Sequence, residues 1–498
     1  MSQAEPFEAQ DTPTDPTIQT TPPPDITTLA QLRASGWRSV PVAEEMRRNA
    51  AIRISAGQPL VGGVLGYERT VLPQLENAVL AGHDVILLGE RGQAKTRLIR
   101  SMVGLLDEWI PEVAHSEIHD DPYRPVSRYA KDLVEAEGDG TPIAWVHRGD
   151  RYGEKLATPD TSIADLIGEV DPIRVAEGRY LSDELTIHYG LVPRLNRGIF
   201  AVNELPDLAE RIQVGLLNVL EERDVQIRGH RVRLPLDIVL VATANPEDYT
   251  NRGRIITPLK DRFGAQIRTH YPPDAATELR IARLEADLPG AGGADDGDAP
   301  IGPTLVMPDF MAEIVAELSQ LARESPHLNQ RSGVSVRLTI ANYETLAANA
   351  VRRALRNGES EAVPRISDLQ SLVSSTQGKV EIETLEEGRE EVLLQQLVSA
   401  AVLLVFRRRV HLDDPRALVA AFTEETVVHA GDDLPAAAYA ETLSSVPGLS
   451  APVLALAGTE DPGVVASAIE LILEGLHLTK RLNKEAAGAR ATYRGRGG

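Results

Sequence analysis

The sequence of 498 residues contains no cysteine. Disulfide bonds, catalysis by a thiol and zinc sites with cysteine ligands are therefore excluded. The longest apolar run, Leu397 to Phe406, is too short to cross a membrane, because a membrane-spanning helix needs about 20 residues. The N-terminus is acidic and rich in proline, unlike the basic and then apolar start of a signal peptide, so we expect a cytoplasmic protein.

Basic residues are scarce relative to acidic ones. The 51 Lys and Arg residues against 73 Asp and Glu residues give a formal net charge of −22. General affinity for nucleic acid needs a basic surface that neutralises phosphates, so this charge argues against it without excluding one local basic groove. Hydrophobic residues make up 42% of the chain, which is ordinary for a globular protein with two to four domains.

The most informative stretch runs from Asp84 to Thr96. An apolar segment that suits a buried strand is followed by a short loop and then by a helical pattern. The backbone N–H groups of such a loop and the helix dipole face a phosphate, Lys95 reaches the outer phosphates, and the Thr96 hydroxyl ligates Mg²⁺. The stretch therefore predicts a site for ATP and Mg²⁺. The predicted nucleotide-binding residues are Gly89, Glu90, Arg91, Gly92, Gln93, Ala94, Lys95 and Thr96.

The match to the phosphate-loop pattern G-x-x-x-x-G-K-[ST] is incomplete. Ala94 stands where the second glycine is usual, and its Cβ could crowd the backbone. Gly92, two residues earlier, can supply part of the lost backbone freedom. Taken alone, the motif leaves an ordinary strand–turn–helix open as the alternative.

Two further apolar strands end in polar residues. Residues 198–202 lead into Asn203 and Glu204, and residues 237–244 lead into Asn245. Open α/β sheets bind ligands at the carboxyl edge of their strands, so these side chains lie at the edge expected for a site. Hydrolysis of a nucleotide needs an acid that organises Mg²⁺ and water, and a polar group that senses the outer phosphate. The three residues can supply both.

The order of these motifs resembles that of the AAA+ ATPases, and more specifically the magnesium-chelatase AAA+ subunit and the MoxR-type proteins. Residues 190–204, 220–235 and 241–264 carry the resemblance, which covers less than half of the chain. It implies an AAA+ P-loop NTPase core, an α/β domain with a parallel sheet, followed by an α-helical lid. The period of apolar residues after this lid adds a C-terminal helical region.

Domain boundaries follow from this resemblance together with the composition. The acidic, proline-rich start cannot bury enough surface to fold, and a Gly/Asp/Ala stretch separates the core from the lid. The predicted parts are a disordered tail (1–30), the α/β core with a helical lead-in (31–275), a linker (276–305), the helical lid (306–375), a C-terminal helical region (376–482) and a second disordered tail (483–498).

The resemblance also implies roles for individual residues. Glu204 matches the Walker B glutamate that polarises the attacking water, and Asn245 matches sensor 1, which holds that water against the γ-phosphate. Arg262 matches the arginine finger that reaches the ATP of the next subunit, with Arg252 and Arg254 as alternatives.

Further matches lie in the lid and in two insertions. Arg337 matches sensor 2, through which the lid closes on nucleotide. The segment Val225 to Leu234 resembles the hairpin inserted before sensor 1, and residues 140–190 correspond to the insertion in the second helix of this clade. Arginines on the hairpin favour either a grip on a polyanion or partner, or simply a solvated face.

One departure from the family concerns the Mg²⁺ site. Asn203 stands where the family has aspartate, which removes a negative charge from the surroundings of Mg²⁺. The asparagine carbonyl can still orient a bound water, so Asn203 is predicted to act on Mg²⁺ indirectly. Together with Ala94, this departure predicts a slow ATPase.

The resemblance implies an oligomeric, hexameric, ATP-driven motor that remodels a partner protein, with a von Willebrand factor A domain protein as partner. One alternative is the motor subunit of a Mg²⁺ or Co²⁺ chelatase, and another is a nucleotide-gated scaffold with weak hydrolysis. A separate observation concerns His115 and His119, whose spacing can put two imidazoles on one helix face for a metal, although no third ligand is evident.

Overall fold

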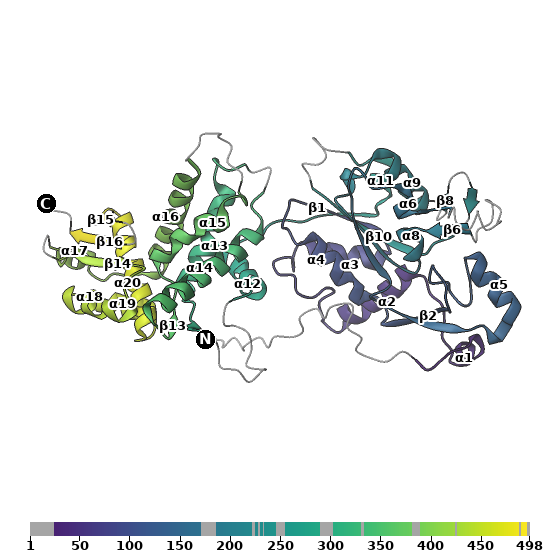
Figure 1. The fold of residues 1–498 in the computed structure, drawn as a ribbon, viewed down its shortest axis with the longest axis horizontal. Coiled ribbons are helices and arrows are strands. Elements are labelled where there is room, and N and C mark those ends of the chain that lie inside the picture. Colours follow the sequence, from purple (N-terminus) through teal and green to yellow (C-terminus); the bar gives the residue numbers. More distant parts are fainter. Residues whose placement is uncertain are drawn as a thin grey trace. The chain divides into compact units, whose positions relative to one another are not determined.

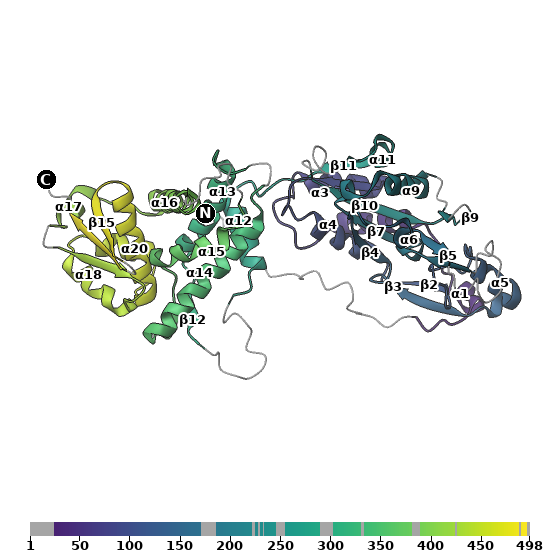
Figure 2. The ribbon, with the colours of Figure 1, turned by 45° about the horizontal axis from the view of Figure 1, so that its top comes forward.

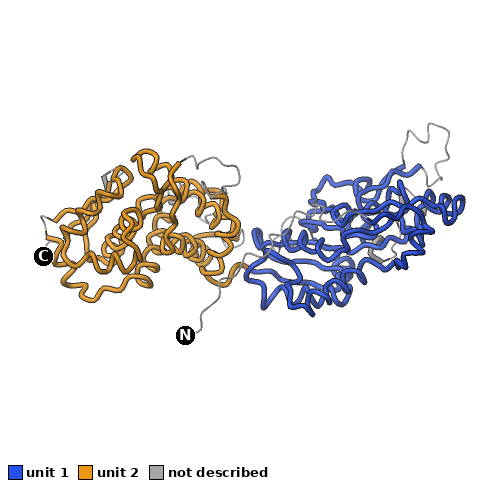
Figure 3. Tube along the Cα trace, turned by 90° about the horizontal axis from the view of Figure 1, so that it is seen from below, with its two compact units in different colours: residues 1–270 blue, residues 271–498 orange. Residues whose placement is uncertain are grey.

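The computed structural model describes most of the chain in two compact units, divided between His270 and Tyr271 (Figure 1, Figure 3). Each unit is considered by itself. The described residues are 24–170, 186–221, 225–227, 230–232, 234–245, 254–288, 302–329, 333–380, 389–423, 426–487 and 490–495.

A five-stranded parallel sheet forms the centre of the first unit. Its two central apolar strands, β7 and β10, are buried along their whole length, as their sequences predict. This sheet confirms the predicted α/β core. In spatial order the strands are β11 (Ala265–Arg268), β1 (Val85–Leu88), β10 (Ile238–Ala244), β7 (Gly198–Asn203) and β4 (Tyr152–Leu156).

Helices cover both faces of this sheet, because successive strand residues point to opposite sides. Leu87 and Val241 pack on one face with α2, α3 and α4, whereas Ile86 and Leu240 pack on the other face with α8, α9 and α11 (Figure 1). The helices are α2 (Val42–Ser55), α3 (Val71–Ala81), α4 (Lys95–Ser101), α6 (Ile163–Leu166), α8 (Leu191–Arg194), α9 (Glu210–Glu221) and α11 (Thr257–Arg262).

Three antiparallel strand pairs in the described part of the first unit lie outside the central sheet. The pairing of β8 (Val225–Ile227) with β9 (His230–Val232) confirms the predicted hairpin. The predicted insertion at 140–190 is too wide, because β4 belongs to the central sheet. The remaining elements of this region are β2 (Trp109–Val113) with β3 (Ile143–His147), α5 (Arg128–Glu137), and β5 (Gly168–Val170) with β6 (Ile187–Tyr189).

The predicted end of the first tail, at residue 30, is also wrong. Helix α1 (Leu29–Ala34) begins inside the predicted tail, and Thr28 closes a capping box with Gln31 at its N-terminus. The predicted disorder of residues 1–23 falls outside the described residues.

The second unit begins with three packed helices. Glu278 on the first of them is fully buried and accepts hydrogen bonds from Arg323 at 2.5 and 2.6 Å and from Gln320 at 2.8 Å. The predicted linker 276–305 therefore starts within a helix. The elements are α12 (Ala275–Glu285), α13 (Asp309–Glu324), α14 (Val336–Asn357), β12 (Thr304–Leu305), β13 (Glu361–Ala362), the 3₁₀ helix η6 (Ile366–Ser371) and α15 (Leu372–Thr376).

The rest of the second unit is mostly helical around α20 (Pro462–Leu478), which is buried along almost its whole length. Among the described residues, no helix has the length and apolar character needed to cross a membrane. The other helices are α16 (Arg389–Arg409), α17 (Pro415–Ala420), α18 (Tyr439–Ser445) and α19 (Ser450–Ala457), with a short 3₁₀ helix η7 (Ala436–Ala438).

The second predicted tail, 483–498, is ordered up to residue 495 apart from 488–489, which are not described. Strands β15 (Leu482–Ala487) and β16 (Arg490–Gly495) pair in a hairpin, and β14 (Val428–Gly431) completes an antiparallel sheet. Figure 2 shows β15 beside α20. The Tyr493 ring is buried and its hydroxyl donates to Glu474 at 2.5 Å, so the prediction of a disordered tail is wrong. Packing of the aromatic ring outweighs the Gly, Ala and Arg composition.

Candidate functional site

The loop between β1 and α4 reverses direction through left-handed backbone conformations. Gly92 has φ of 73°, and Ala94, directly before α4, has φ of 53° and ψ of 19°. A left-handed conformation costs a residue with a Cβ roughly 1–2 kcal/mol, and glycine avoids this cost. Ala94 therefore carries strain at the position where the phosphate-loop pattern has glycine.

The start of the loop is closely packed. A Cβ at Gly89 would lie 2.0 Å from the Thr269 hydroxyl and 2.2 Å from Gln93 Oε1, so only glycine fits. Gln93 Oε1 accepts hydrogen bonds from the Thr269 hydroxyl at 2.7 Å and from the Glu90 N–H at 3.1 Å. The loop is thus braced against the residue that follows β11.

Tyr67 also contacts this loop. Its hydroxyl lies 2.8 Å from the carbonyl oxygens of Gln93 and of His270. Burial raises the pKa of Tyr67 to about 12, so the hydroxyl stays protonated and donates at neutral pH. The sequence analysis missed Tyr67, because a tyrosine far from the motif carries no local signal.

Lys95 joins the phosphate loop to the neighbouring strand. Its Nζ donates to the carbonyl oxygens of Gly89 at 2.6 Å and Glu90 at 2.7 Å, and to Asn245 Oδ1 at 2.9 Å. Lys95 and Asn245 are both buried. The structure therefore brings together two predicted site residues that are 150 positions apart.

Glu204 follows β7 in a left-handed conformation, with φ of 55° and ψ of 48°. Its N–H donates to the Thr243 hydroxyl at 3.0 Å, and that hydroxyl donates to Asn203 Oδ1 at 3.3 Å. Thr243 therefore holds both predicted residues that end β7. Thr243 was not predicted from the sequence. Its signal there is a polar side chain within an apolar strand, two positions before Asn245 and therefore on the same side of β10.

Asn203 is held at its other end by Glu154 on the neighbouring strand β4. Asn203 Nδ2 donates to Glu154 Oε1 at 2.5 Å, and Glu154 also accepts from Arg100 Nε at 2.8 Å and the Tyr152 hydroxyl at 2.9 Å. Burial opposes ionisation of Glu154, but the hydrogen bonds from Arg100, Tyr152 and Asn203 outweigh it and lower the pKa of Glu154. No sequence motif pointed to this carboxylate.

The predicted arginines lie farther from this cluster along the chain. Arg262 is exposed in the last turn of α11, and Arg254 is exposed just before that helix. Arg252 falls outside the described residues. Arg337 is exposed in the first turn of α14, in the second unit. Their roles stay predictions.

The two histidines do not form the predicted helical pair. His115 and His119 have φ values of 63° and 50°, and neither lies in a helix. His119 Nδ1 lies 2.7 Å from Glu112 Oε2. Within the described part of the chain, no group of three or more His, Cys, Asp or Glu side chains could hold a metal ion.

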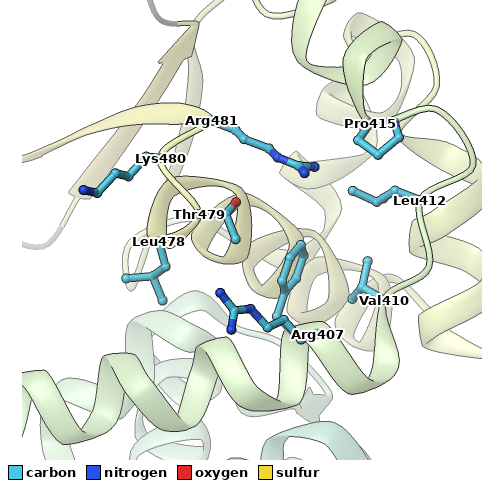
Figure 4. A pocket seen from close by; sticks show the side chains of 9 residues that line it. Arg407, Val410, Leu412, Pro415, Leu478, Thr479, Lys480 and Arg481 are labelled. Atoms are coloured by element: carbon cyan, nitrogen blue, oxygen red, sulfur yellow. The ribbon is translucent and has the colours of Figure 1, made fainter.

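The second unit has a cavity of about 580 Å³ at the C-terminal ends of α16 and α20 (Figure 4). Its basic side chains complement the negative ends of the two helices, which is a structural role. We therefore assign this cavity no part in nucleotide binding. Its lining residues are Phe406, Arg407, Val410, Leu412, Pro415, Leu478, Thr479, Lys480 and Arg481.

The residues of the first unit fit ATP and Mg²⁺. An ammonium group, a hydroxyl and amide oxygens lie at the carboxyl edge of β1, β10 and β7, and the Glu154 carboxylate on β4 contacts Asn203 there. Mg²⁺ prefers oxygen ligands, and Lys95 and Thr96 are the residue types that bind nucleotide phosphates and their metal. A parallel α/β sheet with this loop and these strand ends defines a P-loop nucleotide-binding domain of the AAA+ class.

Comparison with known proteins refines this class. No family model matches the chain. The chain is similar to the magnesium-chelatase subunit ChlI of Nostoc sp., with 26% identity over 45% of this chain and 58% of the relative. It is similar to subunit ChlI of Nephroselmis olivacea (30%, 45% and 59%) and to the magnesium-chelatase 38 kDa subunit of Rhodobacter capsulatus (28%, 44% and 58%). The chain thus spans less than two thirds of the length of these relatives.

Two solved structures resemble parts of the chain. A model of the complex between subunits BchI and BchD of magnesium chelatase has 22% identity and a TM-score of 0.33, covering 66% of this chain and 97% of that one. NtrX from Brucella abortus has 14% identity and a TM-score of 0.35, covering 60% and 55%. By its curated relatives, the chain is similar to the ATPase subunits of magnesium chelatase.

Proposed function

We propose that this chain binds and hydrolyses ATP as an oligomeric AAA+ motor that remodels a partner protein. The observation that carries the proposal is the hydrogen bond of 2.9 Å between Lys95 Nζ and Asn245 Oδ1, which links the phosphate loop to the sensor position. Glu204, at the end of the adjacent strand β7, supplies the carboxylate that hydrolysis requires.

Each side chain then has a task in hydrolysis. Lys95 binds the outer phosphates, and Thr96 and Asn203 hold the metal directly and through water. Bound Mg²⁺ neutralises phosphate charge. Glu204 orients and polarises the attacking water, and Asn245 holds that water with its amide. Because Lys95 already bonds to Asn245, a change at either residue affects the other.

A ring of subunits completes the site. Arg262 is exposed in the last turn of α11, where a neighbouring subunit could receive it as an arginine finger. On the family resemblance we propose a hexameric ring and a partner with a von Willebrand factor A domain. A cytoplasmic location and the lack of general nucleic-acid binding stay predictions from the sequence.

A second candidate function is the motor subunit of a Mg²⁺ or Co²⁺ chelatase. The curated relatives favour it, because all three named above are magnesium-chelatase subunits. Genes for porphyrin synthesis beside the gene for this chain would favour the chelatase. A von Willebrand-type neighbour alone would favour the remodelling motor.

Mg²⁺-dependent ATP turnover, measured over a range of protein concentrations, tests the proposal. We expect Glu204→Gln and Arg262→Ala each to lower turnover by at least about a hundredfold, the scale of losing a main stabilising group of the transition state. Glu210→Gln and Arg268→Ala are matched controls, because both residues are exposed in the same unit.

Turnover per subunit that rises with protein concentration supports sites shared between subunits. ATP binding without turnover would contradict hydrolysis by the isolated chain and favour the nucleotide-gated scaffold. Full turnover in Glu204→Gln would overturn the assignment of the site.

A further inference from the structure

We propose that Glu154 is a positioning residue for Mg²⁺, and that it supplies from strand β4 the negative charge that Asn203 does not carry. The inference rests on nucleotide binding at the site described above. It goes further by assigning a role to a carboxylate outside the motifs of the chain.

Hydrogen bonds on both sides of the Asn203 amide fix its orientation. Its Nδ2 donates to Glu154 Oε1 at 2.5 Å, and its Oδ1 accepts from the Thr243 hydroxyl at 3.3 Å. A carboxylate accepts hydrogen bonds only, so it selects the amide nitrogen and fixes which way the side chain points. Without Glu154, the buried amide could turn over and present its nitrogen where its oxygen now lies.

Glu154 is also linked to the helix that follows the phosphate loop. Arg100, which pairs with Glu154 at 2.8 Å, lies four residues after Thr96 in α4. Residues four apart in a helix share one face, so Arg100 and Thr96 point to the same side. Glu154 therefore connects the helix face of Thr96 with Asn203 at the end of β7.

The arrangement around Glu154 differs from an ordinary surface ion pair. Exposed ion pairs contribute at most about 1 kcal/mol, and the Arg100 side chain is 62% exposed. By contrast, the Asn203 residue is only 8% exposed and β4 pairs directly with β7. The carboxylate thus points inward to a buried amide and carries its charge toward the metal-binding edge.

The test is the Mg²⁺ concentration for half-maximal binding of a fluorescent ATP analogue to the full chain. Loss of a residue that orients a metal ligand typically weakens metal affinity about 10- to 100-fold, and we expect Glu154→Gln to raise the midpoint at least about tenfold. Asp165→Asn is the matched control, because Asp165 pairs with Lys155, the next residue on β4, and should leave the midpoint unchanged.

A swap variant distinguishes charge from simple packing. Glu154→Gln combined with Asn203→Asp exchanges the carboxylate and the amide between β4 and β7 while keeping the net charge and a hydrogen-bonding pair. We expect the swap to return the Mg²⁺ midpoint to within about threefold of the original, which is less than 1 kcal/mol. Because the swap conserves both groups, it decides the question even where Glu154→Gln alone lowers stability.

A wild-type midpoint in Glu154→Gln, or a swap variant no better than Glu154→Gln, would overturn the inference. The readout is binding, so absence of ATP turnover would contradict the proposed hydrolysis and leave this inference standing. A chain whose nucleotide binding does not depend on Mg²⁺ would overturn both.

Discussion

Two polar clusters among the described residues have opposite arrangements. At the nucleotide site, side chains from β4, β7, β10 and α4 meet at a sheet edge around an arginine that is largely exposed. In the second unit, Arg353, Arg365, Asp368 and Glu470 are buried. Asp368 accepts from Arg353 and from the Arg365 N–H, and Glu470 accepts from the Ser367 N–H and the Tyr439 hydroxyl. The comparison shows that buried, paired charges depend on each partner being present, because removing one leaves an uncompensated charge, whereas convergence at an open edge prepares a ligand site.

Backbone strain follows the same division. Of the described non-glycine residues with positive φ, Ala94, His115, His119, Arg197 and Glu204 lie in the first unit, and only Lys480 lies in the second. Two of the five belong to the nucleotide site. Strain of this kind persists only where the surroundings enforce it, and it gathers at functional sites.

The largest expected effect comes from breaking the closed cluster. Asp368 is fully buried and accepts from Arg353 Nη2 at 3.1 Å, Asn349 Nδ2 at 2.7 Å and the Arg365 N–H at 2.8 Å. Asp368→Ala removes the carboxylate shared by the buried Arg353 and Asn349 and leaves Arg353 with Glu359 as its ion-pair partner. We therefore expect a loss of about 3–5 kcal/mol in the free energy of unfolding. Chemical denaturation measures it.

The control for this change is Asp433→Ala, which removes an exposed partner of Arg490 and should cost less than about 1 kcal/mol. Equal losses in the two variants would contradict a special role for the buried cluster.

Thr243→Val keeps the shape of the side chain. Compared with Asp368→Ala, we expect it to lower stability less and to lower ATP turnover more. It leaves the Glu204 N–H without its acceptor, a loss of about 1–3 kcal/mol, and frees the strained conformation at Glu204. We expect ATP turnover to fall at least about tenfold, since 1.4 kcal/mol corresponds to that factor.

Thr161→Val is the matched control. Thr161 is equally buried in the same unit, and its hydroxyl hydrogen-bonds to the backbone N–H and the hydroxyl of Thr158 rather than to a residue of the nucleotide site. A similar fall in turnover in both variants would contradict the role of Thr243.

The two clusters also predict opposite responses to pH. Burial raises the pKa of Glu470, so its folded form binds a proton more tightly than its unfolded form, and its contribution to stability falls as pH rises above its ordinary pKa. Hydrogen bonds lower the pKa of Glu154, so its contribution is present above the ordinary pKa and is lost as pH falls through the lowered value.

Denaturation of Glu470→Gln and of the original chain at pH 5 and pH 8 checks the first half of this prediction. The decrease in stability from pH 5 to pH 8 should be smaller in the variant. An unchanged difference between the two pH values would contradict a raised pKa at Glu470.

The amount that could be predicted from the sequence differs between the two units. Strands β1, β7 and β10, and the residues that end them, could be predicted because apolar runs and motif spacing are local. Thr243, Glu154 and Tyr67 act through contacts between distant segments, which no local pattern contains. The C-terminal sheet was missed for a similar reason, since Tyr493 stabilises it by packing against α20 within a segment that looks like a disordered tail.

Ala94 could be identified from the sequence as a departure, and the structure shows its physical cost. Because Ala94 has φ of 53°, Ala94→Gly relieves about 1–2 kcal/mol of left-handed strain. Glycine also gains freedom in the unfolded chain, which returns about 0.5–1 kcal/mol of that gain. We therefore expect a net stabilisation of about 0–1.5 kcal/mol in the denaturation of the first unit, the smallest effect of the series. Gly92→Ala, at φ of 73°, is the reciprocal change and should lower the stability of the same unit. A loss of stability in Ala94→Gly would contradict a cost of the left-handed conformation at Ala94.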